Sequence, residues 1–343
     1  MNTYQLPKNW YNLAAAFSYG FFSFSAVIVN KVVLSKWDFN FPLTMIACQM
    51  IVSYGLLMGL KSAGLISVPN WSMETAKKAY PLALSHCINV ILGLSSLSLV
   101  SIPMFSTLRR TGVAYVMALE FILLKKRQPS SIIASVGLIV LGALVAGWND
   151  LNFDLFGYVL TCTVNVTTAL ALTLIPKIGK AADLGPLGLM LYQITLGFPL
   201  IVLAILMSGE YVDMLAYPHW SSPSFLILFF MSCAQIFVLN YSIFLCTTVN
   251  SPLTTTVTGA LKDCAQTVGG FFIFDLSIQF FNLVGISIGM SGGILYSYLK
   301  YLESESRSKP AHSPEEKDEP LLAPGHIMVD KFADADKDED DRR

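Results

Sequence analysis

A lysine and an aspartate stand side by side within an apolar stretch of the sequence. The segment 250–263 reads NSPLTTTVTGALKD and ends in Lys262 and Asp263. Charged side chains are costly in hydrocarbon and usually have a function there. Four polar residues recur every four positions and therefore share one face of a helix, namely Thr254, Thr258, Lys262 and Gln266. This pattern predicts a hydroxyl-rich face that ends in an ammonium, a group suited to binding phosphate.

Other residues of the same segment could complete an anion site. Thr255 and Gly259 lie beside the polar face, and a glycine lets a ligand approach the backbone closely. Asp263 is expected to be a poor direct partner for Lys262, because adjacent side chains diverge on a helix. The structural alternative is that Lys262 pairs with another internal carboxylate or extends toward the helix end. We predict ligand contacts from Lys262, Asp263, Gly259, Thr255 and Thr258.

A second group of cations lies in an earlier apolar stretch. Arg109 and Arg110 are adjacent, and their planar guanidinium groups match phosphate oxygens. Glu120 follows Arg109 by close to three helical turns, or about 16 Å, which is too far for direct pairing. We expect one arginine to hold two helices together and the other to face an anionic ligand. Lys31, at the end of the first apolar stretch, is a further candidate ligand.

Amide side chains occur in two further apolar stretches. Gln193 follows Tyr192 in one of them, and Asn240 lies in the other. Buried amides must find hydrogen-bond partners. A planar base such as uracil would supply them and would stack on a tyrosine, while hydrogen bonding between helices is an equal alternative. We take Tyr192, Gln193 and Asn240 as candidate ligand contacts, and His86 and Asn89 as packing residues.

The elements that must position these residues are membrane-spanning helices. The chain is 54% hydrophobic and 13% charged, whereas soluble domains are about 25% charged. A helix of about 20 apolar residues spans the hydrocarbon core of a bilayer. Ten stretches qualify: 13–34, 42–60, 80–99, 103–124, 131–147, 154–175, 187–207, 224–247, 252–274 and 280–300. The sequence therefore predicts an all-α integral membrane protein with ten transmembrane helices.

Lysine and arginine are distributed unevenly between the predicted loops. If the N-terminus is cytosolic, the opposite side of the membrane holds only Lys36. The cytosolic side then holds Lys8, Lys61, Lys77, Lys78, Lys125, Lys126, Arg127, Lys177 and Lys180. Cytosolic loops are enriched in these residues, so we expect both termini to be cytosolic.

Two short patterns recur at nearly the same offset. The segments ending in Pro103 and Pro252 open the fourth and ninth stretches, 149 residues apart, and Val136-Gly137 and Val284-Gly285 are 148 residues apart. Five spans in each half require the second half to enter from the opposite side, which is the inverted-repeat arrangement with a site near the midplane. We predict a cytosolic segment 1–12, repeats at 13–147 and 154–300, and a disordered acidic cytosolic tail at 303–343.

Small residues in the fifth and tenth stretches, including Gly142 and Gly285, are expected to pack helices closely. They are compatible with either a monomer or a homodimer. The six cysteines lie in predicted spans without metal-ligand spacing, so core thiols are expected. We expect no metal, no cofactor and no nucleic-acid partner, and a lipid bilayer around the helices. An integral-membrane enzyme acting on a lipid phosphate is the alternative of another class, and a structural or sorting protein is a third.

These motifs together resemble nucleotide-sugar transporters of the drug/metabolite transporter superfamily, over nearly all of residues 10–303. Four segments carry the resemblance: 102–110 (IPMFSTLRR), 120–126 (EFILLKK), 250–263 and 295–298 (LYSY). They are most similar to the branch that carries UDP-glucuronate, UDP-N-acetylgalactosamine and UDP-N-acetylglucosamine. The resemblance implies exchange of a cytosolic UDP-sugar for UMP, rather than enzymatic activity, in the Golgi membrane or alternatively the endoplasmic reticulum membrane.

The departures from related branches bear on the substrate. GDP-mannose carriers resemble this chain at Gly259 but read GALNK, so lysine falls one place earlier here, at Lys262. Their FYNN motif, credited with holding guanine, corresponds to residues 191–194, which read LYQI. The UDP-sugar branch usually has asparagine where this chain has Asp263. Uracil is therefore favoured over guanine, the sugar stays open, and a GDP-sugar/GMP or plastid-type sugar-phosphate carrier is the alternative within transport.

Overall fold

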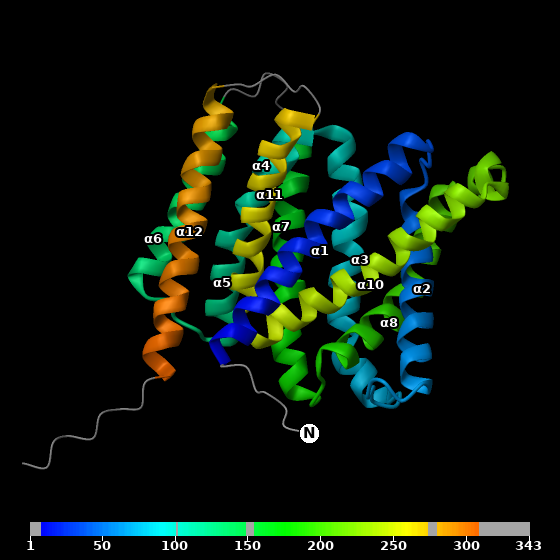
Figure 1. The fold of residues 1–343 in the computed structure, drawn as a ribbon, viewed down its shortest axis with the longest axis horizontal. Helices are drawn as coiled ribbons and strands as arrows, with labels where there is room; N and C mark the ends of the chain where they lie inside the picture. The colour runs from blue at the N-terminus through cyan, green and yellow to red at the C-terminus, as the bar shows by residue number, and fades with distance from the viewer. Residues whose placement is uncertain (1–7, 101, 149–153, 274–279, 309–343) are drawn as a thin grey trace, which may run out of the picture.

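The computed structural model describes residues 8–308 except 101, 149–153 and 274–279, and every regular element in this part of the chain is helical (Figure 1). The elements are α1 (Lys8–Lys36), α2 (Pro42–Ser62), α3 (Met73–Leu99), α4 (Ile102–Arg110), α5 (Gly112–Leu124), α6 (Ser130–Ala146), α7 (Leu155–Ala181), α8 (Pro186–Ser208), α9 (Glu210–Leu215), η1 (Pro218–Ser221), α10 (Pro223–Val249), α11 (Pro252–Ile273) and α12 (Phe280–Ser308). The predicted acidic tail lies almost entirely outside the described residues.

The architecture is that of an integral membrane protein. Six helices of the described residues are long and apolar enough to cross a bilayer, namely α1, α2, α3, α7, α8 and α10, and α6 is a shorter apolar helix. Within the described residues, helices cover most of each of the ten predicted apolar stretches. Prolines at the first turns of α2, α8 and α10 suit positions where no backbone donor is needed. The all-α prediction is confirmed for this part of the chain.

One predicted span is divided in two. The stretch 103–124 forms α4 and α5, which are separated at Thr111. Asn165 of α7 donates hydrogen bonds to the carbonyl oxygen of Leu108 (2.9 Å) and to Thr111 Oγ1 (3.2 Å). The break is therefore stabilised from another helix. As a result Arg109 and Arg110 occupy the last turn of α4, where the negative end of the helix dipole favours cations.

Close packing of backbones joins α6 to α12. A Cβ atom built on Gly142 would lie 2.5 Å from the carbonyl oxygen of Gly285, and one on Gly292 would lie 2.9 Å from Ile139 N. These glycines allow the two helices to approach (Figure 1), so the prediction that they pack helices is confirmed. Gly137, also on α6, has no neighbour within 4 Å of such a Cβ.

Helix pairing elsewhere follows a regular pattern. α3 packs on α7 and α8, while α10 packs on α1 and α2. In Figure 1, α1 and α10 lie next to each other and run obliquely across the more upright helices. A large apolar core forms where α2, α3, α7, α8 and α10 meet, with Leu82, Tyr192 and Phe244 among its members.

Two carboxylates cap helices to which they do not belong. Glu120 of α5 is fully buried and accepts hydrogen bonds from Leu253 N (2.8 Å), at the start of α11, and from Gln128 Nε2 (2.9 Å). Glu210 of α9 accepts from Thr44 N (2.7 Å) at the start of α2. The first backbone donors of a helix have no partner within that helix. Glu120 therefore serves as a structural cap for α11.

Candidate functional site

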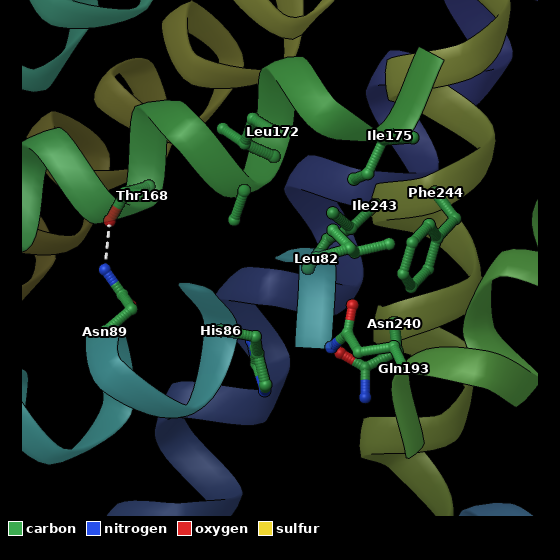
Figure 2. Close-up of a pocket in the computed structure, with 11 residues that line it drawn as sticks. Leu82, His86, Asn89, Thr168, Leu172, Ile175, Gln193, Asn240, Ile243 and Phe244 are labelled. Carbon is green, nitrogen blue, oxygen red and sulfur yellow. Dashed lines mark hydrogen bonds between the residues drawn. The ribbon is translucent and has the colours of Figure 1, made fainter. Parts of the chain in front are cut away.

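A cavity of about 120 Å³ lies between α3, α7, α8 and α10. Its apolar wall includes Leu172, Ile175 and Phe244 (Figure 2). Its polar residues are His86, Asn89, Thr168, Gln193 and Asn240. The cavity therefore brings together two of the predicted ligand contacts, Gln193 and Asn240, from different helices.

Gln193 and Asn240 lie next to each other at one end of the cavity (Figure 2). Gln193 is 8% exposed, and neither amide makes a hydrogen bond to any other described residue. Buried amides are nearly always bonded in folded proteins. The pair is therefore available to the polar edge of a ligand.

The two residues that we expected to serve packing differ from each other. Asn89 Nδ2 donates to Val164 O (2.9 Å), Thr167 Oγ1 (3.0 Å) and Thr168 Oγ1 (2.5 Å), so it ties α3 to α7 as expected (Figure 2). His86 lines the cavity and makes no hydrogen bond within the described residues. Its imidazole thus departs from the expectation of a satisfied packing residue.

The two arginines have different environments. Arg110 is 3% exposed and donates from Nη2 to the backbone oxygen of Asp263 (3.4 Å), which ties α4 to α11. Arg109 donates from Nη1 to Thr168 Oγ1 (3.0 Å), and Thr168 lines the cavity. Each arginine therefore joins α4 to a second helix, Arg110 to α11 and Arg109 to α7, and Arg109 does so at the wall of the cavity. That one arginine faces an anionic ligand stays a prediction.

Lys262 and Asp263 form an ion pair, with Nζ 2.8 Å from Oδ1. The expectation that these neighbours would not pair is wrong. Both side chains are largely buried, at 15% and 26% exposure, and an unpaired charge in such surroundings is costly. The long lysine stem can bend toward the carboxylate despite the diverging Cβ directions. The charge of Asp263 also acts on Arg109, so the anion lies among several cations.

The side chain of Tyr19, from α1, lies beside these charges, which we call the cationic cluster: Lys262, Arg109, Arg110 and their carboxylate Asp263. A Cβ built on Gly259 would lie 3.0 Å from the Tyr19 hydroxyl, and the charges of Asp263 and Arg109 act on that hydroxyl. Gly259 therefore faces the Tyr19 hydroxyl at close range, and the approach of a ligand to its backbone stays a prediction. Sequence reasoning missed both Tyr19 and Thr168, because only the packing of α1 and α7 against α11 and α4 brings them here.

Three predicted contacts lie elsewhere. The Tyr192 hydroxyl accepts from Ser72 N (2.9 Å), and its ring stacks on Trp71 with centroids 4.9 Å apart, so it supports the loop before α3 instead of the cavity. Thr255 is buried and bonded to Thr247 of α10 (3.0 Å). Thr258 donates to the backbone of its own helix, at the oxygen of Thr254 (2.9 Å). The side chains of Lys31 and Gln266 lie outside the described residues.

A cavity with amides at one end and arginine and lysine side chains near it has the chemistry to bind a ligand that is both polar and anionic. Residues 12–297 match the sequence model of the Triose-phosphate Transporter family. The chain belongs to this family. Its members are transporters rather than enzymes, which sets aside the alternative of a lipid-phosphate enzyme.

Curated relatives of this Triose-phosphate Transporter family member cover most of its length. It is 35% identical over 301 residues to a UDP-N-acetylglucosamine transporter of Arabidopsis thaliana, covering 84% of this chain and 88% of the relative. It is 34% identical over 325 residues to a nucleotide sugar transporter of Mus musculus, covering 93% and 98%. A UDP-sugar transporter of Caenorhabditis elegans is 34% identical, covering 88% and 92%. The resemblance to nucleotide-sugar transporters is confirmed.

A solved crystal structure shares the fold of this family member. The TM-score is 0.63 at 10% sequence identity, and the match covers 85% of this chain and 98% of the other. At this identity the similarity concerns the fold alone.

Proposed function

We propose that this transporter exchanges a cytosolic UDP-sugar for UMP across the Golgi membrane, or alternatively the endoplasmic reticulum membrane. The observation that carries the proposal is the connection at Thr168. This residue lines the cavity that holds Gln193 and Asn240, and it also binds Arg109 of the cationic cluster. A nucleotide has a planar base at one end and phosphates at the other, so the two parts of the site match the two parts of the ligand.

The assignment of the base depends on the amides. Gln193 and Asn240 together offer donors and acceptors to the polar edge of a base, and Phe244 offers an aromatic wall. The relatives named as UDP-sugar transporters and the sequence LYQI at 191–194 in place of FYNN both support uracil. Lys262 and Arg109 are the cations that we assign to the phosphates, with Arg110 holding α4 against α11.

Alternating access requires two arrangements of the same helices. We infer two inverted repeats, 13–147 and 154–300, and both termini in the cytosol. The helix contacts support the inverted repeats. Suppose that α1, α2, α3 and α6 of the first repeat correspond, in this order, to α7, α8, α10 and α12 of the second. The packing of α3 on α7 and α8 is then equivalent to the packing of α10 on α1 and α2, and both sets of contacts are present. A pair of equivalent packings is what inverted-repeat carriers use to open to either side.

The volume of the cavity is too small for a whole nucleotide sugar. At about 120 Å³ it is smaller than the roughly 300–1,000 Å³ of most small-molecule sites, so a nucleotide sugar requires further opening.

The close glycine contacts of α6 and α12 are made within one chain, and they therefore give no argument for a homodimer.

The test is exchange in proteoliposomes. Purified protein is reconstituted, the vesicles are preloaded with UMP or GMP, and uptake of labelled UDP-sugars and GDP-mannose is measured. We expect UDP-sugar uptake that depends on internal UMP. Uptake of GDP-mannose driven by GMP would overturn the base assignment, and equal uptake into empty vesicles would overturn the exchange mechanism.

A further inference from the structure

The carboxylate of Asp263 occupies a place that should attract anionic ligands. Its Oδ1 lies 2.8 Å from Lys262 Nζ, the cation that we assign to phosphate. The same carboxylate interacts electrostatically with Arg109, and Arg110 donates a hydrogen bond to the backbone oxygen of Asp263. A ligand phosphate that approaches Lys262 must therefore compete with a carboxylate that belongs to the protein.

The charges of the cluster can be compared with those of the ligands. Counted over the described side chains, three cations (Lys262, Arg109 and Arg110) and one carboxylate (Asp263) give the cluster a net charge of +2. A phosphate monoester such as UMP carries about −1.5 to −2 at neutral pH. The diphosphate of a UDP-sugar carries about one negative charge on each phosphate. The cluster with Asp263 thus matches both ligands in charge, whereas a neutral residue at this position would leave an excess cation.

We propose that Asp263 is an internal counter-ion that competes with the ligand for Lys262 and sets the charge balance of the loaded site. The inference rests on the proposed function, because it takes a nucleotide phosphate as the ligand. In the empty site the carboxylate holds the ammonium. When phosphate binds, the Lys262 ammonium exchanges its contact with Asp263 for a contact with the ligand. The loaded site then has a net charge near zero.

Two consequences follow for transport. Competition by the carboxylate weakens binding, so the ligand is released more readily on each side of the membrane. A loaded site near neutrality can also be closed off from water between the helices at a smaller electrostatic cost than one with a residual charge, because burying an unbalanced charge is expensive. Asp263 therefore lowers the affinity for the ligand and raises the maximal exchange rate.

The experiment compares Asp263→Asn with wild type, because asparagine keeps the size of the side chain and removes its charge. Binding of UMP, GMP and inorganic pyrophosphate to the purified full chain is measured in detergent, and exchange is measured in proteoliposomes. We expect the Kd of D263N for UMP to fall about fivefold, the factor that corresponds to an ion pair worth about 1 kcal/mol. We expect the maximal exchange rate to fall several-fold at the same time.

Two further variants serve as controls. Asp263→Glu keeps the carboxylate on a longer side chain and should change both Kd and maximal rate less than D263N does. Asp154→Asn removes a carboxylate that caps α7 by accepting a hydrogen bond from Gly157 N at 2.8 Å, and asparagine can cap in the same way. This second variant should match wild type. If D263N melts below wild type, Asp263→Ser provides a second neutral side chain for the same comparison.

The outcomes separate this inference from the proposed function. A higher Kd for UMP in D263N would show that Asp263 positions Lys262 for the phosphate and would overturn the counter-ion role, as would an unchanged Kd. Tighter binding of GMP than of UMP by wild type would reject the uracil assignment, while the D263N comparison could still be made with GMP. Binding of none of the three probes by wild type would reject the anion site and this inference together.

Discussion

The hydroxyl of Thr168 accepts a hydrogen bond from Arg109, whose Nη1 lies 3.0 Å from Thr168 Oγ1. The same oxygen accepts from Asn89 Nδ2 (2.5 Å), and its proton goes to the backbone oxygen of Val164 (2.8 Å). With its proton committed to the backbone, the hydroxyl can only accept from the two side chains. One atom of α7 therefore fixes a side chain of α3 and a cation of α4 at the wall of the cavity.

We predict that Thr168→Val slows exchange about tenfold, because a hydrogen bond to a charged group contributes about 1.5–3 kcal/mol and Arg109 loses its anchor. Thr168→Ser keeps the hydroxyl and should restore most of the rate. Initial rates over a range of UDP-sugar concentrations give the measurement. If T168V and wild type had the same rate at low and at saturating substrate, Thr168 would not position Arg109.

Lys262→Ala should abolish exchange while the protein still folds and reaches its membrane. The substitution removes the cation assigned to phosphate and leaves Asp263 without the partner at 2.8 Å. Uptake, thermal melting and localisation of a tagged protein are measured together. Lys78→Ala is the matched control, since Lys78 is half-exposed and forms an ion pair with Glu74 one turn earlier, an arrangement that contributes little. Near-normal uptake by K262A would remove Lys262 from the site.

Adjacent residues of α8 should respond in different ways. Gln193→Leu removes an amide from the cavity and should weaken UMP binding with little effect on melting. Tyr192→Phe removes the hydroxyl that bonds Ser72 N (2.9 Å) and should lower the free energy of unfolding by about 1 kcal/mol with UMP affinity unchanged. Binding and melting curves of both variants give the test. A loss of UMP affinity in Y192F would return Tyr192 to the site.

Two glycines of α6 offer a test of the packing between α6 and α12. Gly142→Ala forces a methyl group against the backbone of Gly285 and Gly289 and should destabilise the protein by about 1–3 kcal/mol, as overpacking commonly does. Gly137→Ala meets open space and should leave the melting temperature unchanged. Equal melting of the two variants would mean that α6 and α12 can separate without cost.

Much of this protein is determined by its sequence because the relevant signals are local. Long apolar stretches with few charges must be helices in a bilayer. In the part of the chain that the structure describes, the predicted stretches are mostly helical, and six helices are long and apolar enough to span. Cations in such stretches must serve a ligand or another helix, and the segments 102–110 and 250–263 also carry the family resemblance. Composition and periodicity were sufficient for these conclusions, since neither depends on which helices are neighbours.

The tertiary structure decided which neighbours each side chain has. Arg109 and Arg110 are equivalent in sequence, yet one meets Thr168 of α7 and the other meets the backbone of α11. Tyr192 and Gln193 point to a loop and to the cavity respectively. The break at Thr111 depends on Asn165 from a helix more than fifty residues away in the chain. In hydrocarbon a polar group must be satisfied by whatever group faces it, so only the packing of the helices determines whether a buried polar residue binds another helix or remains available to a ligand.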